Sequence, residues 1–358
     1  MKILKFGGTS VGSPERMKSV AKIIDDGQVK IVVLSAVTGT TNALVEIGNL
    51  LTEGKKDFAK EKIESLYTHY VKFVQELYST DNGKKQGNTV VEYHFSLIKS
   101  HLEKSCGVSE QKVLLAQGEL ISTHLFHHYL EEIGKNSALL PALEFMKIDE
   151  DHEPVLSFIE SELPKFLAQN PEKEFYITQG YIARNPAGEI DNLKRGGSDY
   201  TATLIGAALR SEEVQIWTDI DGMHNNDPRI VRKTFPIRQL SFDEAAELAY
   251  FGAKILHPTC IRPTMDRNVP VRLLNTMQPT EKGTLISQHN TSGRLITAIA
   301  AKDNITAIKI KSGRMLNAYG FLRRVFEVFE KNKTSIDVIT TSEVALSMTI
   351  DDNSKLQE

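Results

Sequence analysis

Two glycine-rich stretches of the sequence each carry a cation beside a glycine pair. They are Lys5-Phe6-Gly7-Gly8-Thr9-Ser10 and Lys194-Arg195-Gly196-Gly197-Ser198-Asp199. Each follows a strand-like run and opens a helix-like one, and a helix N-terminus offers unpaired N–H groups and a positive dipole end to an anion. A single Gly-Gly pair is more often only a tight turn that requires positive φ. Two such turns with adjacent cations favour a phosphate site, although neither matches the Walker or dinucleotide-binding fingerprint.

The first glycine stretch lies in a strand–loop–helix–strand opening. Lys2 to Phe6 is a short apolar run that ends at the glycines. Ser13-Pro14-Glu15 then supplies an N-cap serine, a proline at the first helical position and an acid in the first turn, which predicts a helix start. Ile31-Val32-Val33-Leu34 is continuously apolar, as is typical of a strand buried on both faces of a parallel sheet. This βαβ opening predicts an α/β fold, with a mostly parallel sheet in a three-layer α/β/α sandwich.

The later segments predict a larger domain over residues 1–290 and a smaller one over 300–358. The first continues with a helix-rich region at 41–134, strands at 175–178 and 214–217, a helix at 200–209, and a capping box at 241–244. The polar stretch 287–293 predicts a linker. The second has the pattern strand 305–310, helix 321–329, strand 336–339 and strand 344–350. This order is only part of a small α+β domain, so we expect the chain to stop within that domain.

Composition excludes several classes of protein. The 358 residues are 41% hydrophobic and 25% charged, which excludes a disordered or collagen-like chain. The net charge is −3, so no basic excess indicates a nucleic-acid or anionic-membrane partner. Two cysteines, Cys106 and Cys260, cannot form a disulfide framework and suit a reducing compartment. Without an N-terminal signal-peptide pattern or a membrane-length apolar run, we expect a cytoplasmic protein.

The motifs occur in an order that resembles the aspartokinases, members of the amino acid kinase family. The opening Lys5-Phe6-Gly7-Gly8-Thr9-Ser10-Val11 is similar to the signature of that family. Further matches are Gln117-Gly118-Glu119, Gly196-Gly197-Ser198-Asp199-Tyr200-Thr201-Ala202, Trp217-Thr218-Asp219-Ile220-Asp221-Gly222, Asp227-Pro228-Arg229 and Phe251-Gly252-Ala253-Lys254-Ile255-Leu256-His257-Pro258. The tail resembles the start of the paired ACT regulatory modules, most specifically at Ile339-Thr340-Thr341-Ser342-Glu343.

The resemblance implies transfer of the γ-phosphoryl group of ATP to the β-carboxylate of L-aspartate, the first step of lysine, threonine and methionine biosynthesis. Because an Asp side chain has a pKa near ~3.9, that carboxylate is already ionised at neutral pH and needs no general base. The site instead needs cations and N–H donors on the phosphates, and groups that hold the α-ammonium and α-carboxylate of the substrate. ATP and Mg²⁺ are the implied cofactors, with Mg²⁺ bridging the phosphates.

Site residues follow from the same resemblance. Lys5 is the expected cation on the transferring phosphoryl group, and Asp199 is the second expected catalytic residue. Glu119 pairs with the substrate ammonium, and Arg195 holds a carboxylate with its guanidinium fork. The remaining expected substrate residues are Ser35, Thr41 and Ser198, and the remaining expected ATP residues are Gly7, Gly8, Ser10, Thr218, Asp219, His224, Arg229 and Lys254. His224 stands where many aspartokinases place a tyrosine against the adenine. No residue is assigned as a direct metal ligand.

Several of these residues also have a purely structural interpretation. Glu119 could be an ordinary helix-surface charge, and Asp199 a first-turn acid worth about 0.3–1 kcal/mol to its helix. Lys254 could complement the C-terminal end of a helix, and Asp227-Pro228-Arg229 alone indicates a turn. The histidines at 124, 127 and 128 have a helical spacing, but without a His-Glu-x-x-His pattern or a cysteine pair they indicate packed or surface side chains rather than a metal site.

Regulation is implied by the tail. In lysine-inhibited aspartokinases the effector lies against positions that match Met315, Gly320, Asp337, Thr341, Ser342 and Glu343. The acids Asp337 and Glu343 favour lysine over threonine, although acids beside an edge strand also discourage unwanted pairing. We expect an effector response and a homodimer in a longer form, and little response from these 358 residues.

Two other functions remain open at this point. The chain could be an amino acid kinase that acts on glutamate, acetylglutamate or carbamate; Glu119 and Arg195, which suit an α-amino acid, argue against the last two. It could also be a non-catalytic amino-acid sensor on a kinase scaffold. Lys5 discriminates here, because a sensor has no use for a cation at the phosphoryl position.

Overall fold

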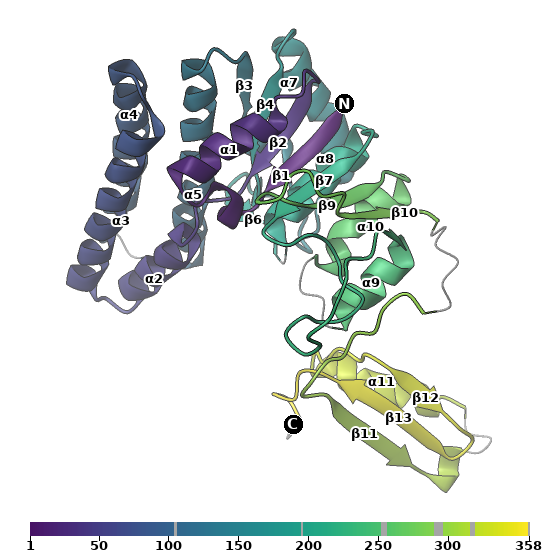
Figure 1. Cartoon of the computed structure of the whole chain (residues 1–358). Coiled ribbons are helices and arrows are strands. Elements are labelled where there is room, and N and C mark those ends of the chain that lie inside the picture. The colour runs from purple at the N-terminus through teal and green to yellow at the C-terminus, as the bar shows by residue number, and fades with distance from the viewer. Residues whose placement is uncertain (104–105, 195, 252–255, 290–295, 316–318, 357–358) are drawn as a thin grey trace. The chain divides into compact units, whose positions relative to one another are not determined.

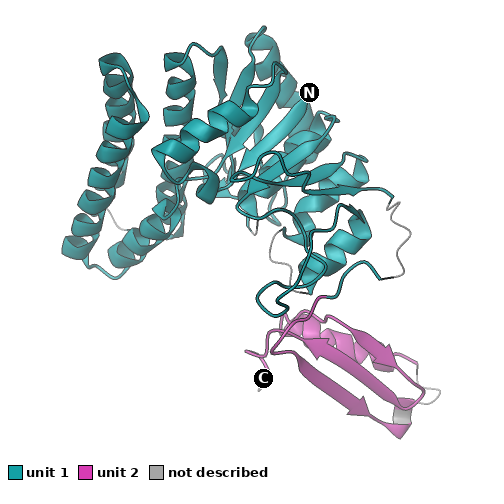
Figure 2. Cartoon of the chain, viewed as in Figure 1, with its two compact units in different colours: residues 1–299 teal, residues 300–358 magenta. Residues whose placement is uncertain are grey.

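The computed structural model describes residues 1–358 except 104–105, 195, 252–255, 290–295, 316–318 and 357–358. The chain divides into two compact units, residues 1–299 and 300–358 (Figure 2). Each unit has its own sheet. The expected residues Arg195 and Lys254, with half of the motif at 251–258, lie outside the described residues.

Unit 1 is built on an eight-stranded, mostly parallel sheet (Figure 1). The strands, in spatial order, are β3 (Ser137–Leu140), β4 (Phe175–Gln179), β2 (Lys30–Leu34), β1 (Lys2–Phe6), β7 (Val214–Thr218), β9 (Val271–Asn275), β10 (Thr284–Ser287) and β8 (Gln239–Ser241). Neighbouring strands are parallel from β3 to β9, β10 is antiparallel to β9, and β8 is parallel to β10. Every residue of β2 and β4 is buried, as predicted for the interior of a parallel sheet.

Helices cover both faces of the sheet and form two separate cores. Alternate residues of a strand point to opposite faces, so Leu4 packs in one core and Ile3 in the other. The first core is completed by α1 (Pro14–Ile24), α2 (Thr40–Thr52), α3 (Lys56–Leu77), α4 (Asp81–Ser100) and α5 (Val108–Glu132). The second is completed by α6 (Ala142–Phe145), α7 (Leu156–Gln169), α8 (Gly197–Ala208), α9 (Phe242–Tyr250) and α10 (Pro258–Asp266). The predicted three-layer α/β/α sandwich is confirmed.

Local sequence signals explain where two of these helices begin. The Ser13 hydroxyl accepts a hydrogen bond from the Arg16 N–H, and Pro14 occupies the first helical position of α1. At α9 the predicted capping box is present, because the Ser241 hydroxyl accepts from the Glu244 N–H while the Glu244 carboxylate accepts from the Ser241 N–H. Both predicted starts are therefore confirmed. A small hairpin, β5 (Ile182–Arg184) and β6 (Ile190–Asn192), was not predicted.

Unit 2 is a three-stranded antiparallel sheet with one helix, α11 (Phe321–Lys331). The order is β11 (Thr306–Lys311), β13 (Ala345–Ile350) and β12 (Ile339–Thr341). Alternate residues of β13, Leu346, Met348 and Ile350, are buried. The expected strand at 336–339 begins only at 339, although the Asp337 N–H still donates to the Thr349 carbonyl. The unit thus has an α+β fold.

Buried histidine predicts a pH-dependent stability. His94 of α4 is 4% exposed and its ring bonds with Gln117 Oε1 at 2.7 Å. Burial lowers the pKa of His94 to about 4, below the ~6.5 of an exposed histidine. Between pH ~6.5 and pH 4, this histidine therefore binds a proton in the unfolded chain but not in the folded one. The free energy of unfolding falls by up to roughly 3 kcal/mol as the pH is lowered from ~6.5 toward 4. The free energy of unfolding, measured in urea, should be lower at pH 5 than at pH 7.5, and this difference should be smaller in His94→Gln. An equal difference in the variant would contradict the role of His94.

Candidate active site

The predicted residues gather at the carboxyl ends of neighbouring parallel strands. The loops after β1, β2, β4 and β7 begin at Gly7, Ser35, Gly180 and Asp219 and meet at one edge of the sheet. β1 lies between β2 and β7, so the loops on the two sides of β1 lead to helices on opposite faces of the sheet. In a parallel sheet, ligands bind in the crevice that forms where the loops diverge in this way.

A buried ion pair lies directly under the first glycine turn. Lys5 of β1 places its Nζ 2.6 Å from Oδ1 of Asp199, in the first turn of α8, and the two side chains are 11% and 16% exposed. A Cβ added to Gly7 would lie 3.4 Å from the same Nζ, so the ammonium group sits against the glycine turn. The structure thus brings together the two residues that were expected to be catalytic. A phosphoryl group at this turn would meet a cation already fixed in place.

Glu119 of α5 is a buried acid beside the segment that follows β2. It is 4% exposed, and its Oε1 accepts a hydrogen bond of 3.3 Å from the Ala36 N–H. Its Oε2 is buried and has no hydrogen-bond partner among the described residues. Burial raises the pKa of Glu119 to about 8, while the Ala36 N–H and the charge of Lys5 partly offset this. A buried carboxylate oxygen without a partner is costly unless a ligand cation meets it.

Gly118 allows this helix to come close enough to the strand loop. A Cβ at position 118 would lie 2.8 Å from the Ala36 Cβ. The Ser122 hydroxyl, one turn further along α5, donates to the Ser35 carbonyl at 2.8 Å. The motif Gln117-Gly118-Glu119 therefore fixes the carboxylate against the segment after β2 by close backbone packing. The helix-surface interpretation of Glu119 was wrong.

A cavity of about 490 Å³ lies between these elements. Its walls are Gly8, Thr9, Ser35, Ala36, Val37, Thr38, Gly39, Thr41, Asn42, Glu119, Tyr181, Gly197 and Ser198. It contains four of the five expected substrate residues, since Arg195 lies outside the described residues. Its size fits a small polar metabolite.

Tyr181 is a cavity residue that the sequence did not reveal. It lines the cavity with a φ of 70°, an uncommon backbone conformation for a residue other than glycine. Its N–H donates to the Thr201 hydroxyl at 3.0 Å, which holds this conformation. A tyrosine just after a strand has no distinctive local signal, and only its positive φ and its place in the cavity identify it. Strained backbone of this kind is common at ligand sites.

The expected nucleotide residues are more scattered. Ser10 is fully buried and its hydroxyl bonds with the Thr276 hydroxyl at 2.7 Å, so its side chain supports the glycine turn from below. Thr218 ends β7 and donates to the exposed Asp219. Arg229 has a 70% exposed side chain that pairs with Asp227. None of these four expected residues lines the cavity.

His224 is held at both ring nitrogens. Nε2 lies 2.7 Å from Asp221 Oδ1, and Nδ1 lies 2.8 Å from the Thr234 hydroxyl. Both ring nitrogens therefore have partners within the protein. The contact of His224 with the adenine stays a prediction.

A histidine group on α5 has the spacing of metal ligands. In the part of the chain that the structure describes, His127, His128 and Glu131 are the group close enough to share an ion. The His127 ring bonds with the Ser137 hydroxyl and the His128 ring with Glu131, so internal partners already account for these side chains.

The expected effector residues are spread over unit 2. Met315 belongs to a 3₁₀ turn, and Gly320 precedes α11 with a φ of 77°. Thr341 ends β12, and Ser342 closes the turn to β13 through an N–H bond to the Ala345 carbonyl. Burial and the nearby Asp351 raise the pKa of Asp337. Glu343 is exposed in the same turn as Ser342.

Comparison with known proteins agrees with this geometry. The model of the amino acid kinase family matches residues 1–275. The chain belongs to the amino acid kinase family. Aspartokinase 2, chloroplastic, of Arabidopsis thaliana is 39% identical over 98% of this chain and 66% of its own length. Lysine-sensitive aspartokinase 3 of Escherichia coli is 33% identical over 98% of this chain and 78% of its own.

A solved member of the family has the same fold. The crystal structure of E. coli aspartokinase III in complex with aspartate and ADP superimposes with a TM-score of 0.84 at 32% identity, covering 98% of this chain and 79% of that one. The resemblance of the sequence to the aspartokinases is confirmed. The chain spans 66%, 64% and 63% of the lengths of three Arabidopsis aspartokinases. No helix in the described part of the chain is long and apolar enough to cross a membrane.

Proposed function

We propose that this amino acid kinase transfers the γ-phosphoryl group of ATP to the β-carboxylate of L-aspartate. The observation that carries the proposal is the cavity itself, which has the unpaired Oε2 of Glu119 in its wall and the cation of Lys5 beneath the adjoining glycine turn. An α-amino acid with a side-chain carboxylate has the matching charges at its two ends.

The chemistry needs no proton transfer from the protein. A β-carboxylate oxygen of aspartate attacks the γ-phosphorus, the bond from that phosphorus to the β-γ bridging oxygen breaks, and the products are an acyl phosphate and ADP. Lys5 stabilises the charge on the phosphoryl oxygens, and Asp199 holds Lys5 in position. Glu119 holds the α-ammonium group and so aligns the β-carboxylate.

The remaining assignments are supported by motif and position. Ser35, Thr41 and Ser198 line the cavity and offer hydroxyl groups to the substrate. Gly7, Gly8 and Ser10 form the phosphate turn. Thr218 ends β7, and Asp219, His224 and Arg229 follow it on the expected nucleotide side. Arg195 and Lys254 keep their expected roles as the substrate carboxylate clamp and a nucleotide contact.

Mg²⁺ is expected to bind with ATP and to neutralise phosphate charge. Carboxylate oxygens suit this ion, and the exposed Asp219 is the carboxylate among the expected nucleotide residues. We assign no direct protein ligand.

For unit 2 we propose an ACT-like regulatory role with domain boundaries at 1–290 and 300–358. The lysine sensitivity in the name of the E. coli relative supports lysine as the effector. The acids Asp337 and Glu343 suit a cationic amino acid. The effector response and a homodimer are proposed for a longer form of the chain, and a cytoplasmic location is a further part of this proposal.

A panel of acceptors tests the proposed substrate. Release of ADP from ATP should be measured with L-aspartate, L-glutamate, N-acetylglutamate and carbamate at equal concentration. We expect turnover with aspartate, because lengthening the side chain by one carbon displaces the carboxylate when Glu119 holds the ammonium group. Turnover with glutamate and none with aspartate would contradict the proposal.

A further inference from the structure

Two further cavities lie on the sheet face that α1 partly covers. They have volumes of about 350 and 470 Å³ and share Ile23 and Pro279. None of their lining residues belongs to the cavity that contains Glu119. Their sizes fall in the ~300–1,000 Å³ range of small-molecule sites. We call the two together the basic groove.

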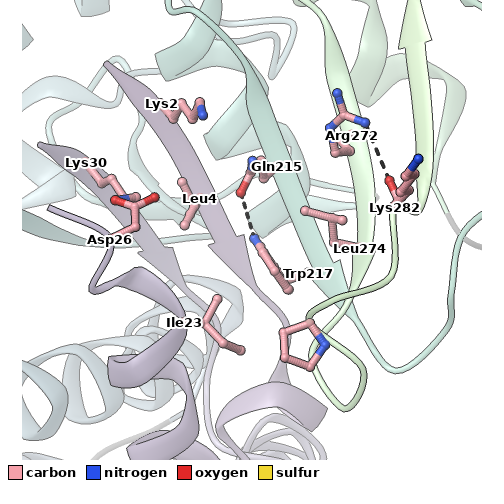
Figure 3. A pocket seen from close by; sticks show the side chains of 11 residues that line it. Lys2, Leu4, Ile23, Asp26, Lys30, Gln215, Trp217, Arg272, Leu274 and Lys282 are labelled. Atoms are coloured by element: carbon pink, nitrogen blue, oxygen red, sulfur yellow. Dashed lines mark hydrogen bonds and ion pairs between the residues drawn. The ribbon is translucent and has the colours of Figure 1, made fainter. Parts of the chain in front are cut away.

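The floor of the basic groove is apolar. Figure 3 shows Leu4, Trp217 and Leu274 on three neighbouring strands, with Ile23 of α1 beside them. The Trp217 ring stacks on Phe6, with the ring centroids 5.7 Å apart. Its indole N–H donates to Gln215 at 3.1 Å, so the ring is fixed in place. Leu4, Trp217 and Leu274 are only 1%, 6% and 6% exposed, so the apolar surface open to a ligand lies mainly at Ile23 and Pro279, which both cavities share.

The rim of the basic groove is cationic. The cations among its lining residues are Arg16, Lys22, Lys2, Lys30, Arg272 and Lys282, and the single acid is Asp26. This concentration occurs in a chain whose net charge is −3. Cations that converge on a concave surface attract anions.

Half of these cations already have acidic partners. Lys2 lies 3.7 Å from Glu212, Lys30 pairs with Asp26, and Arg272 lies 2.8 Å from Glu213.

The other three do not. Arg16 donates to the Thr9 carbonyl at 2.9 Å, and Arg16, Lys22 and Lys282 have no carboxylate partner in the described part of the chain. Each is exposed. A ligand anion would therefore meet three cations that no acid of the described residues neutralises.

We propose that the basic groove binds a small amphipathic organic anion. Its apolar body packs where the two cavities join, against Ile23 and Pro279, and its carboxylate, phosphate or sulfonate group is attracted by Arg16 and Lys22 in one cavity and by Lys282 in the other. A bare inorganic anion leaves the apolar floor in water, and a neutral aromatic compound leaves the cations without a partner. Both features of the groove are used only when one molecule carries both groups.

The groove also touches the support of the phosphate turn. Thr276 lines it, and its hydroxyl bonds with that of Ser10 at 2.7 Å. The Trp217 carbonyl accepts a hydrogen bond from the Gly7 N–H at 3.3 Å. The groove thus lies one residue away from the turn that we assign to the phosphates.

The chain contains one tryptophan, Trp217, which lines the groove and serves as the energy donor to a bound probe. The probe is 1-anilinonaphthalene-8-sulfonate, added to the full 358-residue protein with excitation of the indole. We expect saturable binding of one probe per chain with energy transfer from Trp217. Inorganic sulfate alone, and the uncharged N-phenyl-1-naphthylamine, should each bind at least tenfold more weakly. Equal binding of the uncharged compound would overturn the proposal.

Matched variants separate this site from general charge effects. The double variant Lys22→Glu/Lys282→Glu should weaken probe binding at least tenfold. Lys56→Glu/Lys60→Glu makes the same charge change on exposed lysines of α3 and should leave binding unchanged. Ile23→Phe, which fills the groove and keeps its cations, should also remove binding. Equal weakening by both double variants, or full binding to Ile23→Phe, would show that the probe lies elsewhere.

Discussion

Replacing Lys5 by methionine is expected to lower kcat at least about 10²–10³-fold, the usual cost of removing one donor to the charge that develops in a transition state. Methionine keeps most of the stem that packs in β1, so the fold should persist. The variant leaves the Asp199 carboxylate without its cation, and a modest loss of stability, roughly 1–3 kcal/mol, should accompany the kinetic loss. Steady-state kinetics with ATP and aspartate, together with urea unfolding, measure both effects.

Lys112 provides a matched control for the loss of a partly buried ion pair. Its Nζ lies 2.5 Å from Asp191 Oδ2, and the two side chains are 24% and 3% exposed. Neither residue lines the cavity. Lys112→Met should therefore destabilise the chain to a similar extent and leave kcat within about twofold. Near-normal turnover of the Lys5 variant would refute the assignment of Lys5 to the transferring phosphoryl group.

The second large effect is expected at Glu119. Replacing it by alanine removes the partner of the substrate ammonium, and loss of one member of a desolvated charge pair costs roughly 2–5 kcal/mol. The KM for aspartate should rise at least about tenfold while that for ATP changes little. Glu131→Ala on the same helix, which lies outside the cavity, should change neither. Equal effects on both substrates would mean that Glu119 only supports the fold.

The raised pKa of Glu119 adds a pH dependence to this effect. In the protein without substrate the pKa of Glu119 is about 8. Below that pH its carboxyl group is largely protonated and must lose its proton to pair with an ammonium group. We expect kcat/KM for aspartate to fall as pH is lowered from 8.5 to 6.5, by up to about tenfold per pH unit. Glu119→Gln should lack this slope. A flat profile in the unsubstituted protein would contradict the assignment of a free, buried Glu119.

The parts of the fold that follow from short-range patterns could be predicted from the sequence. Ser13 and Ser241 begin their helices because their hydroxyl groups bond with N–H groups three residues on, and such caps are visible in the sequence. Residues 31–34 of the buried strand β2 form a continuous apolar run. The short strands β8 and β10 at the sheet edge have no such pattern, and only their pairing in the folded chain defines them.

For the active site, residue types were predictable and their contacts were not. The glycine motifs and the resemblance indicated Lys5 and Asp199, but the ion pair between them joins distant parts of the chain. The hydrogen bond between the hydroxyl groups of Ser10 and Thr276 was unpredictable for the same reason, because the two residues are 266 positions apart in the sequence. Tyr181 was missed because a positive φ on a tyrosine depends on the tertiary contacts around it.

Trapping the product with hydroxylamine identifies the carboxylate that receives the phosphoryl group. An acyl phosphate reacts with hydroxylamine to give a hydroxamate, so incubation with ATP, Mg²⁺, L-aspartate and hydroxylamine should yield aspartate β-hydroxamate in an amount equal to the ADP released. Chromatography against the α- and β-hydroxamate standards identifies which carboxylate was phosphorylated. We expect the β-hydroxamate, and Lys5→Met should form it at no more than about one hundredth of the normal rate. ADP release without hydroxamate, or formation of the α-isomer, would contradict it.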